Sequence, residues 1–331
     1  MILGIIKDFK DQHMYYVQAC EELNVEYKII DIISDNWKEN ILKSDCDGFL
    51  IKPPGRKFIW KQMFDEKLFF INKIMKKPIY PNYEEIFLYE NKRVMSYWLN
   101  VHNISHPETH VFFNKSEAKN FLKKANYPIL FKPNLASAGI GIKQINNYHQ
   151  GIKIVNKIFT KFNFFNVGYI KWNKKNGIPY PLLDDRQMDN ILFQKKVDVV
   201  WEWRGVKIGN SYFAHKKLEG KNGMHSGSGI ADYSTPPLEV LDFIKDVCSK
   251  TNFRSMNVDF FEDSNGKFYV NELQTFFGSH IQEYQMLVKN VPGRYIYNEE
   301  WVFEEGQFNR NNSCNLRVLD FINELNGENL L

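Results

Sequence analysis

Two carboxylates face each other across a predicted β-hairpin in residues 256–274. The pair Asn265-Gly266 favours a two-residue type I′ turn, and in the register that this turn sets, Asp259 lies directly opposite Glu272. Like charges at opposed positions destabilise a sheet, because their Cβ atoms are only about 4.5–5.5 Å apart. A hard divalent cation would remove this penalty, since carboxylate oxygens are its preferred ligands. The hairpin therefore indicates a metal site.

Two amides extend this face of the hairpin. Residues two apart in a strand share a face, so Asn257 and Gln274, which the same register pairs, lie beside Asp259 and Glu272. Their carbonyl oxygens add neutral ligands to the two carboxylates. A solvated surface hairpin is the alternative, although apolar neighbours such as Phe260 indicate that both strands are largely buried.

A second feature is a lysine followed by a loop of small residues. Residues 129–132 form a predicted strand that ends in Lys132, and the loop 133–141 follows it. Small side chains let backbone N–H groups approach a polyphosphate, and a lysine beside them neutralises its charge. The loop is neither a Walker A sequence nor a Rossmann fingerprint, because GKS/GKT and GxGxxG are both absent. A tight hairpin between two strands explains the same residues about equally well.

The elements that must position these residues begin with an alternation of strands and helices. In residues 1–85, short apolar runs such as Met1–Ile6 are separated by helical patterns such as residues 58–75. Strands that alternate with helices indicate parallel βαβ units and an open α/β sheet. The proline-rich exit near Pro81 predicts a domain boundary. We therefore expect an N-terminal α/β domain in residues 1–85 and a second domain in residues 86–331.

The composition excludes several classes of protein. The 331 residues are 44% hydrophobic and 25% charged, which is typical of a globular protein. Their net charge of +4 is too mild to indicate a nucleic-acid partner. The four cysteines lie far apart without CxxC spacing, which fits a reducing compartment. We find no signal-peptide pattern and no apolar run near the roughly 18 residues of a membrane span. We expect a soluble cytoplasmic protein without nucleic-acid or membrane partners.

Taken in order, these segments resemble the ATP-grasp family, in particular carboxylate–amine ligases of the RimK and glutathione synthetase type. The resemblance covers roughly residues 85–280. The matched segments are Glu90-Asn-Lys92, Phe131-Lys132 with the loop to Gly141, the hinge Leu192–Val197, Glu202-Trp-Arg204, Lys216-Lys217, Asp259, and Asn271-Glu272-Leu-Gln274 with Gly278 behind it.

The resemblance implies an α/β (α+β) fold, the ATP-grasp fold, behind an N-terminal open parallel α/β domain. Within residues 86–331 it implies a nucleotide lid subdomain at about 108–200, a metal-binding subdomain at about 201–285 and a C-terminal closing segment. Residues 172–190 show no clear period and are predicted to be an excursion from the lid subdomain.

The resemblance also implies cofactors, ATP and Mg²⁺ (or Mn²⁺), and roles for individual residues. The nucleotide-binding residues would be Lys92 and Lys132 at the phosphates, Ser137, Ala138, Gly139 and Gly141 in the lid, Gln194, Lys195 and Val197 at the adenine, and Glu202 at the ribose. The metal ligands would be Asp259, Glu272 and Gln274. Arg204, with Lys217 or Lys216, would be catalytic and face the transferred phosphoryl group or the substrate carboxylate.

Two positions depart from the family pattern. Gln194 stands where the family usually has Glu, and an amide can still accept a hydrogen bond from the adenine amino group. Gln274 stands where the family usually has Asn, so the carbonyl oxygen lies one methylene further out. Asn257, opposite Gln274 in the predicted register, could compensate.

The implied activity joins a small-molecule acid to an amine through an acyl phosphate, with release of ADP and phosphate. A phosphotransferase that uses the same nucleotide site, with a phosphoryl acceptor as substrate, is the alternative. A regulatory nucleotide-binding domain is a third reading, against which the intact lysines and carboxylates argue. The Gly- and Ser-rich stretch 216–229 predicts a loop on the acceptor side, with His225 as a proton acceptor or an incidental surface residue. The sequence leaves open the substrates, the number of metal ions and the oligomeric state, a homodimer included.

Overall fold

The structure of the chain is a computed structural model. It describes residues 1–55, 58–135, 141–160, 189–218, 230–277 and 291–327 with their side chains, and residues 171–175, 178–182 and 287–288 by their backbone. None of the helices in these described ranges is long and apolar enough to cross a membrane.

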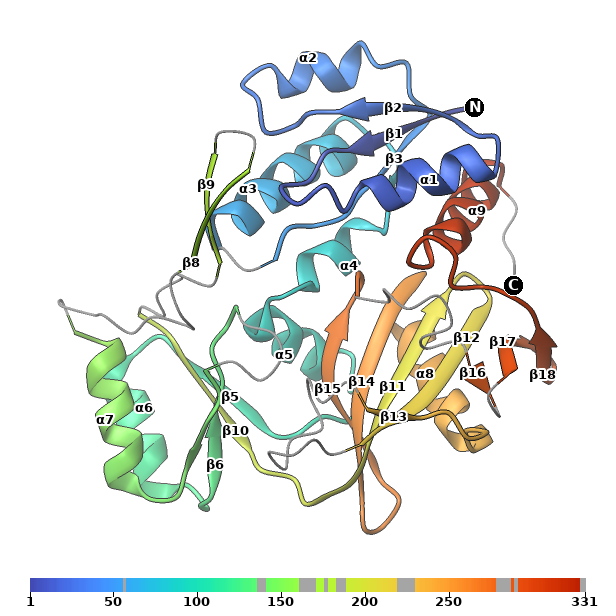
Figure 1. Ribbon diagram of the computed structural model, residues 1–331. Helices are drawn as coiled ribbons and strands as arrows, with labels where there is room; N and C mark the ends of the chain where they lie inside the picture. Colours follow the sequence, from blue (N-terminus) through green and yellow to red (C-terminus); the bar gives the residue numbers. More distant parts are fainter. Residues whose placement is uncertain are drawn as a thin grey trace.

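An open parallel sheet forms the N-terminal part of the chain (Figure 1). Its strand order is β2-β1-β3-β4, and every neighbouring pair is parallel. The alternation of strands and helices that the sequence predicted is confirmed, and α3 continues into η1 over the stretch predicted as one helix. The elements are β1 (Ile2–Ile6), α1 (Met14–Glu22), β2 (Glu26–Ile30), α2 (Trp37–Leu42), β3 (Gly48–Leu50), α3 (Phe58–Phe69), the π-helical η1 (Phe70–Ile74) and β4 (Ile79–Tyr80).

A four-stranded antiparallel sheet, covered by α6 and α7, follows in the middle of the chain (Figure 1). Phe131 and Phe193 on its strands pack with Leu122 of α6 and Ile158 of α7 in one buried cluster. This packing fixes the strand that ends just before Lys132. The elements, in spatial order, are β5 (Thr109–Phe112), β10 (Ile191–Lys195), β6 (Ile129–Phe131) and β7 (Lys143–Ile145), with α6 (Lys115–Lys124) and α7 (Tyr148–Ile158).

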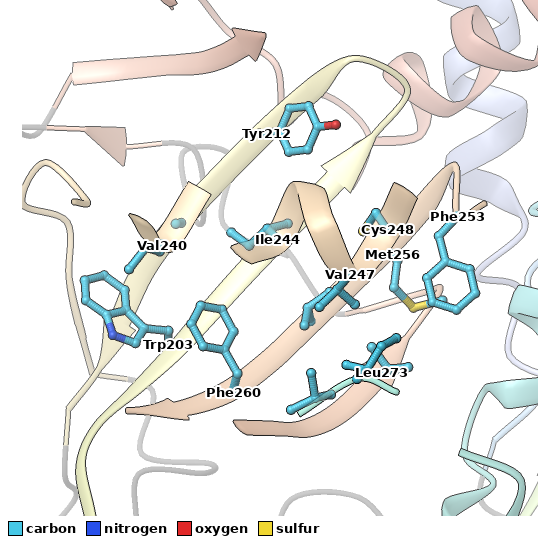
Figure 2. Packing of buried hydrophobic residues seen from close by; sticks show 14 of the residues in the cluster. Trp203, Tyr212, Val240, Ile244, Val247, Cys248, Phe253, Met256, Phe260 and Leu273 are labelled. Atoms are coloured by element: carbon cyan, nitrogen blue, oxygen red, sulfur yellow. The ribbon is translucent and has the colours of Figure 1, made fainter. Parts of the chain in front are cut away.

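An eight-stranded sheet carries the predicted hairpin, and α8 covers one of its faces (Figure 2). A Cβ atom on Gly205 would lie 2.4 Å from Ile244, so α8 approaches closely only because that position is glycine. The elements are β15 (Phe268–Gln274), β14 (Ser255–Asp263), β11 (Val199–Ile208), β12 (Ser211–Lys217), β17 (Val291–Asn298) and β16 (Leu287–Val288) along the sheet, with β13 (Ala231–Asp232) on β12, β18 (Glu300–Glu305) on β17, and α8 (Leu238–Thr251).

Three further helices connect these sheets. A capping box of Asn82 and Glu85 starts α4 (Tyr83–Leu88), and α5 (Lys92–Val101) follows with Asn91 as its cap. The closing helix expected near the C-terminus is α9 (Cys314–Leu325), which packs beside α1 (Figure 1). A separate two-stranded hairpin, β8 (Lys171–Lys175) and β9 (Ile178–Leu182), overlaps the predicted excursion and begins one residue before it.

The turn of the predicted hairpin differs from the sequence-based prediction. The Asp263 N–H donates to Lys267 O at 3.1 Å, so the loop holds three residues, 264–266, and not two. The Asp263 carboxylate accepts the N–H groups of Asn265 at 2.9 Å and Lys267 at 3.0 Å. Such an aspartate favours a three-residue loop closed by a left-handed residue, here Gly266 at φ +74°.

A β-bulge then restores the predicted pairing. Phe260 lies opposite Val270, but the next residue along β14, Asp259, lies opposite Glu272, so Asn271 is the extra residue. Beyond the bulge, the amide pair Asn257–Gln274 also matches the prediction. Both predicted pairs are therefore correct although the predicted turn is wrong, because the bulge offsets the longer loop.

Candidate active site

Asp259 is the centre of a buried ionic network on the face of the large sheet away from α8. Arg204 lies opposite it on β11 and donates from Nε and Nη2 to both carboxylate oxygens, at 3.0 and 3.2 Å. Lys217 of β12 donates to Asp259 as well, and to Oε1 of Glu202 at 2.9 Å. Burial alone would raise the pKa of Asp259, but Arg204 and Lys217 outweigh it and hold this pKa well below its usual range.

The second carboxylate of the hairpin is also paired with a cation of the chain. Lys92, the first residue of α5, lies with Nζ 3.4 Å from Oε1 of Glu272. The premise that Asp259 and Glu272 repel each other until a metal binds is therefore wrong. Cations of the protein already neutralise both carboxylates before any metal is considered.

Lys132 joins the four-stranded sheet to the eight-stranded sheet at this point. Its Nζ donates to Oδ1 of Asn271 at 2.8 Å. Burial lowers the pKa of Lys132 to about 8, and the charge of Lys92 acts in the same direction. A buried cation that is this costly to keep charged is a candidate for contact with an anionic ligand.

Sequence reasoning missed Asn271, which the bulge aims at this site. Val270 and Leu273 are both buried in the core under α8 although they are three residues apart. Because side chains alternate along a strand, this spacing leaves Asn271 and Glu272 together on the opposite face. The position of a bulge depends on the turn, so no local sequence signal could have revealed it.

Counted over the described residues, the network carries a surplus of positive charge. Four cations meet three carboxylates around β11, β12, β14 and β15, and the carboxylates are held in ion pairs of 2.9–3.4 Å besides the shorter contact from Lys217 to Asp259. The cations are Lys92, Lys132, Arg204 and Lys217, and the carboxylates are Glu202, Asp259 and Glu272. Such a cluster is completed electrostatically by an anion.

The structure separates the two neighbouring lysines of β12. Lys217 enters the network, whereas Lys216 lies over the rings of Trp201 and Trp203, at 4.1 and 5.1 Å from their centroids. Trp203 belongs to the core under α8, so Lys216 lies on the other face of the sheet. The structure therefore does not bring Lys216 to the candidate site.

His215 is a second residue that the sequence analysis missed. It lies opposite Arg204 and only 1% of it is exposed. Burial, with the charges of Arg204 and Lys217, lowers its pKa to about 3, so the imidazole is neutral near pH 7. Its spacing of two residues from Lys217 was the available signal, since such residues share a face of a strand.

A small cavity adjoins the network where α5 meets the four-stranded sheet. Its walls are largely apolar, with the two lysines and a few polar side chains among them. Its free volume is about 10 Å³, which is room for about one water molecule. The lining residues are Lys92, Met95, Ser96, Leu99, His106, Thr109, Lys132, Leu192, Gln194 and Val270.

Of the three predicted hinge residues, Gln194 lines this cavity, whereas Lys195 and Val197 are not among its lining residues. Gln194 is buried in its lining. The Lys195 N–H donates to Glu108 O at 2.8 Å, so it is not available to a ligand, while Val197 is half-buried just beyond the strand. Of the predicted lid, Gly141 has φ +75° and Ser137, Ala138 and Gly139 lie outside the described residues, as do His225 and Gly278.

The predicted metal ligands fit a hard cation only with the help of amides. The described residues hold no group of three or more His, Cys, Asp or Glu side chains that could bind a metal. Asn257, fully buried, donates from Nδ2 to Asp259 at 3.0 Å, but its Oδ1 accepts no hydrogen bond from any residue that the structure describes. A buried orphan carbonyl oxygen is costly, and a cation shared with Asp259, Glu272 and Gln274 would satisfy it.

Comparison with solved structures identifies the fold. A RimK domain ATP-grasp protein from Sphaerobacter thermophilus matches at TM-score 0.53 and 12% identity, over 82% of this chain and 90% of that chain. The ADP complex of PurK, an N5-carboxyaminoimidazole ribonucleotide synthetase, matches at TM-score 0.57 and 13% identity, over 86% and 71%. D-alanine–D-alanine ligase from Bacillus anthracis matches at TM-score 0.51 and 15% identity, over 83% and 86%.

At the level of sequence, neither a protein-family model nor a curated protein matches the chain. The similarity is one of architecture, and it agrees with the sheets, their order along the chain and the resemblance of the motifs. The chain has the ATP-grasp fold.

Proposed function

We propose that the protein is an ATP- and Mg²⁺-dependent carboxylate–amine ligase, which forms an amide through an acyl phosphate and releases ADP and phosphate. The observation that carries this proposal is the surplus of buried positive charge, among the residues that the structure describes, at the edge of a small cavity with apolar walls. An apolar slot beside cations suits a ligand with a flat base at one end and phosphates at the other. The solved structures of the same fold named above, a synthetase in its ADP complex and a ligase among them, support this reading.

The nucleotide would span the cavity and the network. Its base would enter between the apolar walls near Gln194, with Lys92 and Lys132 at its phosphates and Glu202 at the ribose. The free volume of about 10 Å³ is far too small for a purine, so the walls must move apart on binding. Met95, a flexible side chain in the wall, is suited to such a movement.

Asp259, Glu272 and Gln274 would hold Mg²⁺, with Asn257 as the further oxygen donor. The metal would neutralise phosphate charge and orient the transferred group. Arg204 and Lys217 both donate to Asp259, where negative charge would grow as the phosphoryl group moves. Their preorganised charges stabilise that growth.

The remaining assignments follow from this placement. We assign residues 1–85 to a pre-ATP-grasp domain and residues 86–331 to the ATP-grasp domain, with 136–141 as the nucleotide lid. The partners are then a small-molecule acid and an amine, and the enzyme acts in the cytoplasm. Fold does not fix the substrates.

Product analysis tests the proposal. The protein is incubated with ATP, Mg²⁺ and panels of small acids and amines, and ADP, phosphate and new products are identified. Release of ADP and phosphate only when an acid and an amine are both present supports the ligase, whereas a stable phosphorylated product would identify a phosphotransferase instead.

Two adjacent lysines provide a matched control. Lys217→Ala should abolish turnover, because Lys217 belongs to the network, and Lys216→Ala should leave it within about twofold of wild type, because Lys216 packs on tryptophans on the other face. Equal losses in the two variants would contradict the placement of the site.

A further inference from the structure

Four polar side chains line the cavity besides its two lysines, namely Ser96, His106, Thr109 and Gln194. Three of them donate to backbone carbonyl oxygens, which can only accept. The bonds are Ser96 Oγ to Arg93 O at 2.9 Å, His106 Nδ1 to Ile104 O at 2.7 Å, and Thr109 Oγ1 to Pro107 O at 2.7 Å. A hydroxyl whose proton is used in this way retains only lone pairs.

The fourth side chain, Gln194, is fixed by the third. Its Nε2 donates to Thr109 Oγ1 at 2.9 Å. Because the Thr109 proton already goes to Pro107, only an N–H group can face the hydroxyl oxygen, and the opposite amide orientation would set two acceptors against each other. The carbonyl oxygen Oε1 of Gln194 is therefore left to accept, and it has no partner within the described part of the chain. The side chain is 5% exposed, so this orientation is held in the lining and not in solvent.

We propose that Thr109 is the residue that makes this cavity select a purine with an amino group at C6 over a purine with a carbonyl group there. The inference rests on the proposed nucleotide site. At Oε1 of Gln194 an amino group donates and is accepted, whereas a carbonyl oxygen in the same place would face another acceptor. A free glutamine could turn over and donate to that oxygen, so Gln194 alone cannot discriminate. Thr109 fixes which end of the amide is the oxygen, so this end accepts as a carboxylate would, while the second N–H of Gln194 stays a donor.

The experiment measures the affinities of ADP and inosine 5′-diphosphate by calorimetry in Mg²⁺ buffer. The two ligands differ at position 6 of the ring, where adenine carries an amino group and hypoxanthine a carbonyl group. Wild type should bind ADP at least about tenfold more tightly, as one hydrogen bond made against one acceptor clash implies. In Thr109→Val, which keeps the shape and removes the oxygen, the ratio of the two affinities should fall about tenfold.

A second substitution separates positioning from packing. In Thr109→Val with Gln194→Glu the preference for ADP should return, because a carboxylate cannot donate whichever way it turns. Thr109→Ser should keep the wild-type ratio, since it keeps the hydroxyl. A purely structural role for Thr109 would weaken both ligands equally and would not be rescued by glutamate at position 194.

The outcomes are distinct from those that test the proposed function. If wild type binds neither nucleotide, the proposed function fails and this inference fails with it. If ADP binds and Thr109→Val leaves the ratio unchanged, Thr109 does not set the preference, and the proposed function stands. Should Thr109→Val not fold, Gln194→Glu alone decides, because a loss of ADP preference in that variant would contradict an acceptor-only site.

Discussion

Two buried arginine–aspartate pairs have nearly the same geometry and lie in different surroundings. Arg254 donates to both oxygens of Asp320, at 2.7 and 3.1 Å, and the Tyr80 hydroxyl donates to the same carboxylate at 2.9 Å. Arg204 donates to both oxygens of Asp259, at 3.0 and 3.2 Å. Distances alone would give the two pairs the same role.

The difference lies in what surrounds each pair. Asp320 joins α9 to the start of β14 and, through Tyr80, to β4, so this pair ties together segments from both ends of the chain. Asp259 lies instead among further cations and carboxylates whose sum is positive, next to a cavity and to the orphan oxygen of Asn257. A buried ion pair that is complete holds a fold, whereas one inside an incomplete cluster is suited to a ligand.

The largest effect should come from breaking the structural pair. Asp320→Asn should lower the free energy of unfolding by about 3 kcal/mol, because Arg254 and the Tyr80 hydroxyl lose the carboxylate that they share. Only the longer contact from Arg254 to Glu324, at 3.4 Å, then remains to that arginine among the described ion pairs. Urea denaturation measures this, with Asp246→Asn as control, since Asp246 and Lys250 form an exposed pair worth under about 0.5 kcal/mol. The ADP affinity of folded Asp320→Asn should equal that of wild type. A large loss of ADP affinity in this variant would contradict a purely structural role for the pair of Arg254 and Asp320.

Breaking the candidate site should affect binding and not folding. Lys132→Met should weaken ADP binding by about 2 kcal/mol, roughly 30-fold, through loss of a charged hydrogen bond to phosphate. The free protein should be no less stable, because burial disfavours the charged form of Lys132. Calorimetry tests the loss of ADP affinity, and urea denaturation tests the undiminished stability of the free protein. Lys123→Met, at an exposed lysine, is the control. Unchanged affinity would remove Lys132 from the site.

The pH dependence of ADP affinity should show directly whether the charge of Lys132 contributes to binding. The pKa of Lys132 is lowered to about 8, so the free protein loses this charge above pH 8 while phosphate favours the protonated form. The dissociation constant should thus be flat below pH 8 and rise above it, by at most about tenfold per pH unit. Lys132→Arg keeps its charge and should remain flat. If the dissociation constant of ADP for wild type stays constant up to pH 9.5, the charge of Lys132 does not contribute to ADP binding.

The smallest effect concerns the free protein with Glu272→Gln. The hairpin pattern alone predicts a slight gain in stability from relieved repulsion. The pair between Lys92 and Glu272 reverses this sign, and we expect a loss of about 1 kcal/mol in the free energy of unfolding. Turnover should be lost, because a proposed metal ligand is removed. A higher melting temperature of the free variant would favour the repulsion view.

Local pattern predicted most of the fold and the strands of the site. The alternation of apolar runs and helical patterns located the parallel sheet, and order along the chain pointed to Lys92, Lys132, Asp259 and Glu272. Side-chain alternation was the signal for His215 and for the separation of Lys216 from Lys217. The bulge at Asn271 could not be predicted, because its position depends on the register of the whole hairpin. Asp263 and Gly266 were available local signals for the three-residue turn. To predict the pairing of Asp259 with Arg204, one would have to know the register between two strands whose paired residues are 55 positions apart in the sequence.

The most direct test of the central claim is calorimetric titration of ADP with and without Mg²⁺, in wild type and in Asp259→Asn. The surplus of positive charge around a metal site predicts that wild type binds ADP and that Mg²⁺ strengthens the binding by about tenfold or more. In Asp259→Asn this strengthening should disappear. Absence of ADP binding by wild type, or an equal effect of Mg²⁺ in the variant, would contradict the assignment of this cluster as a metal–nucleotide site.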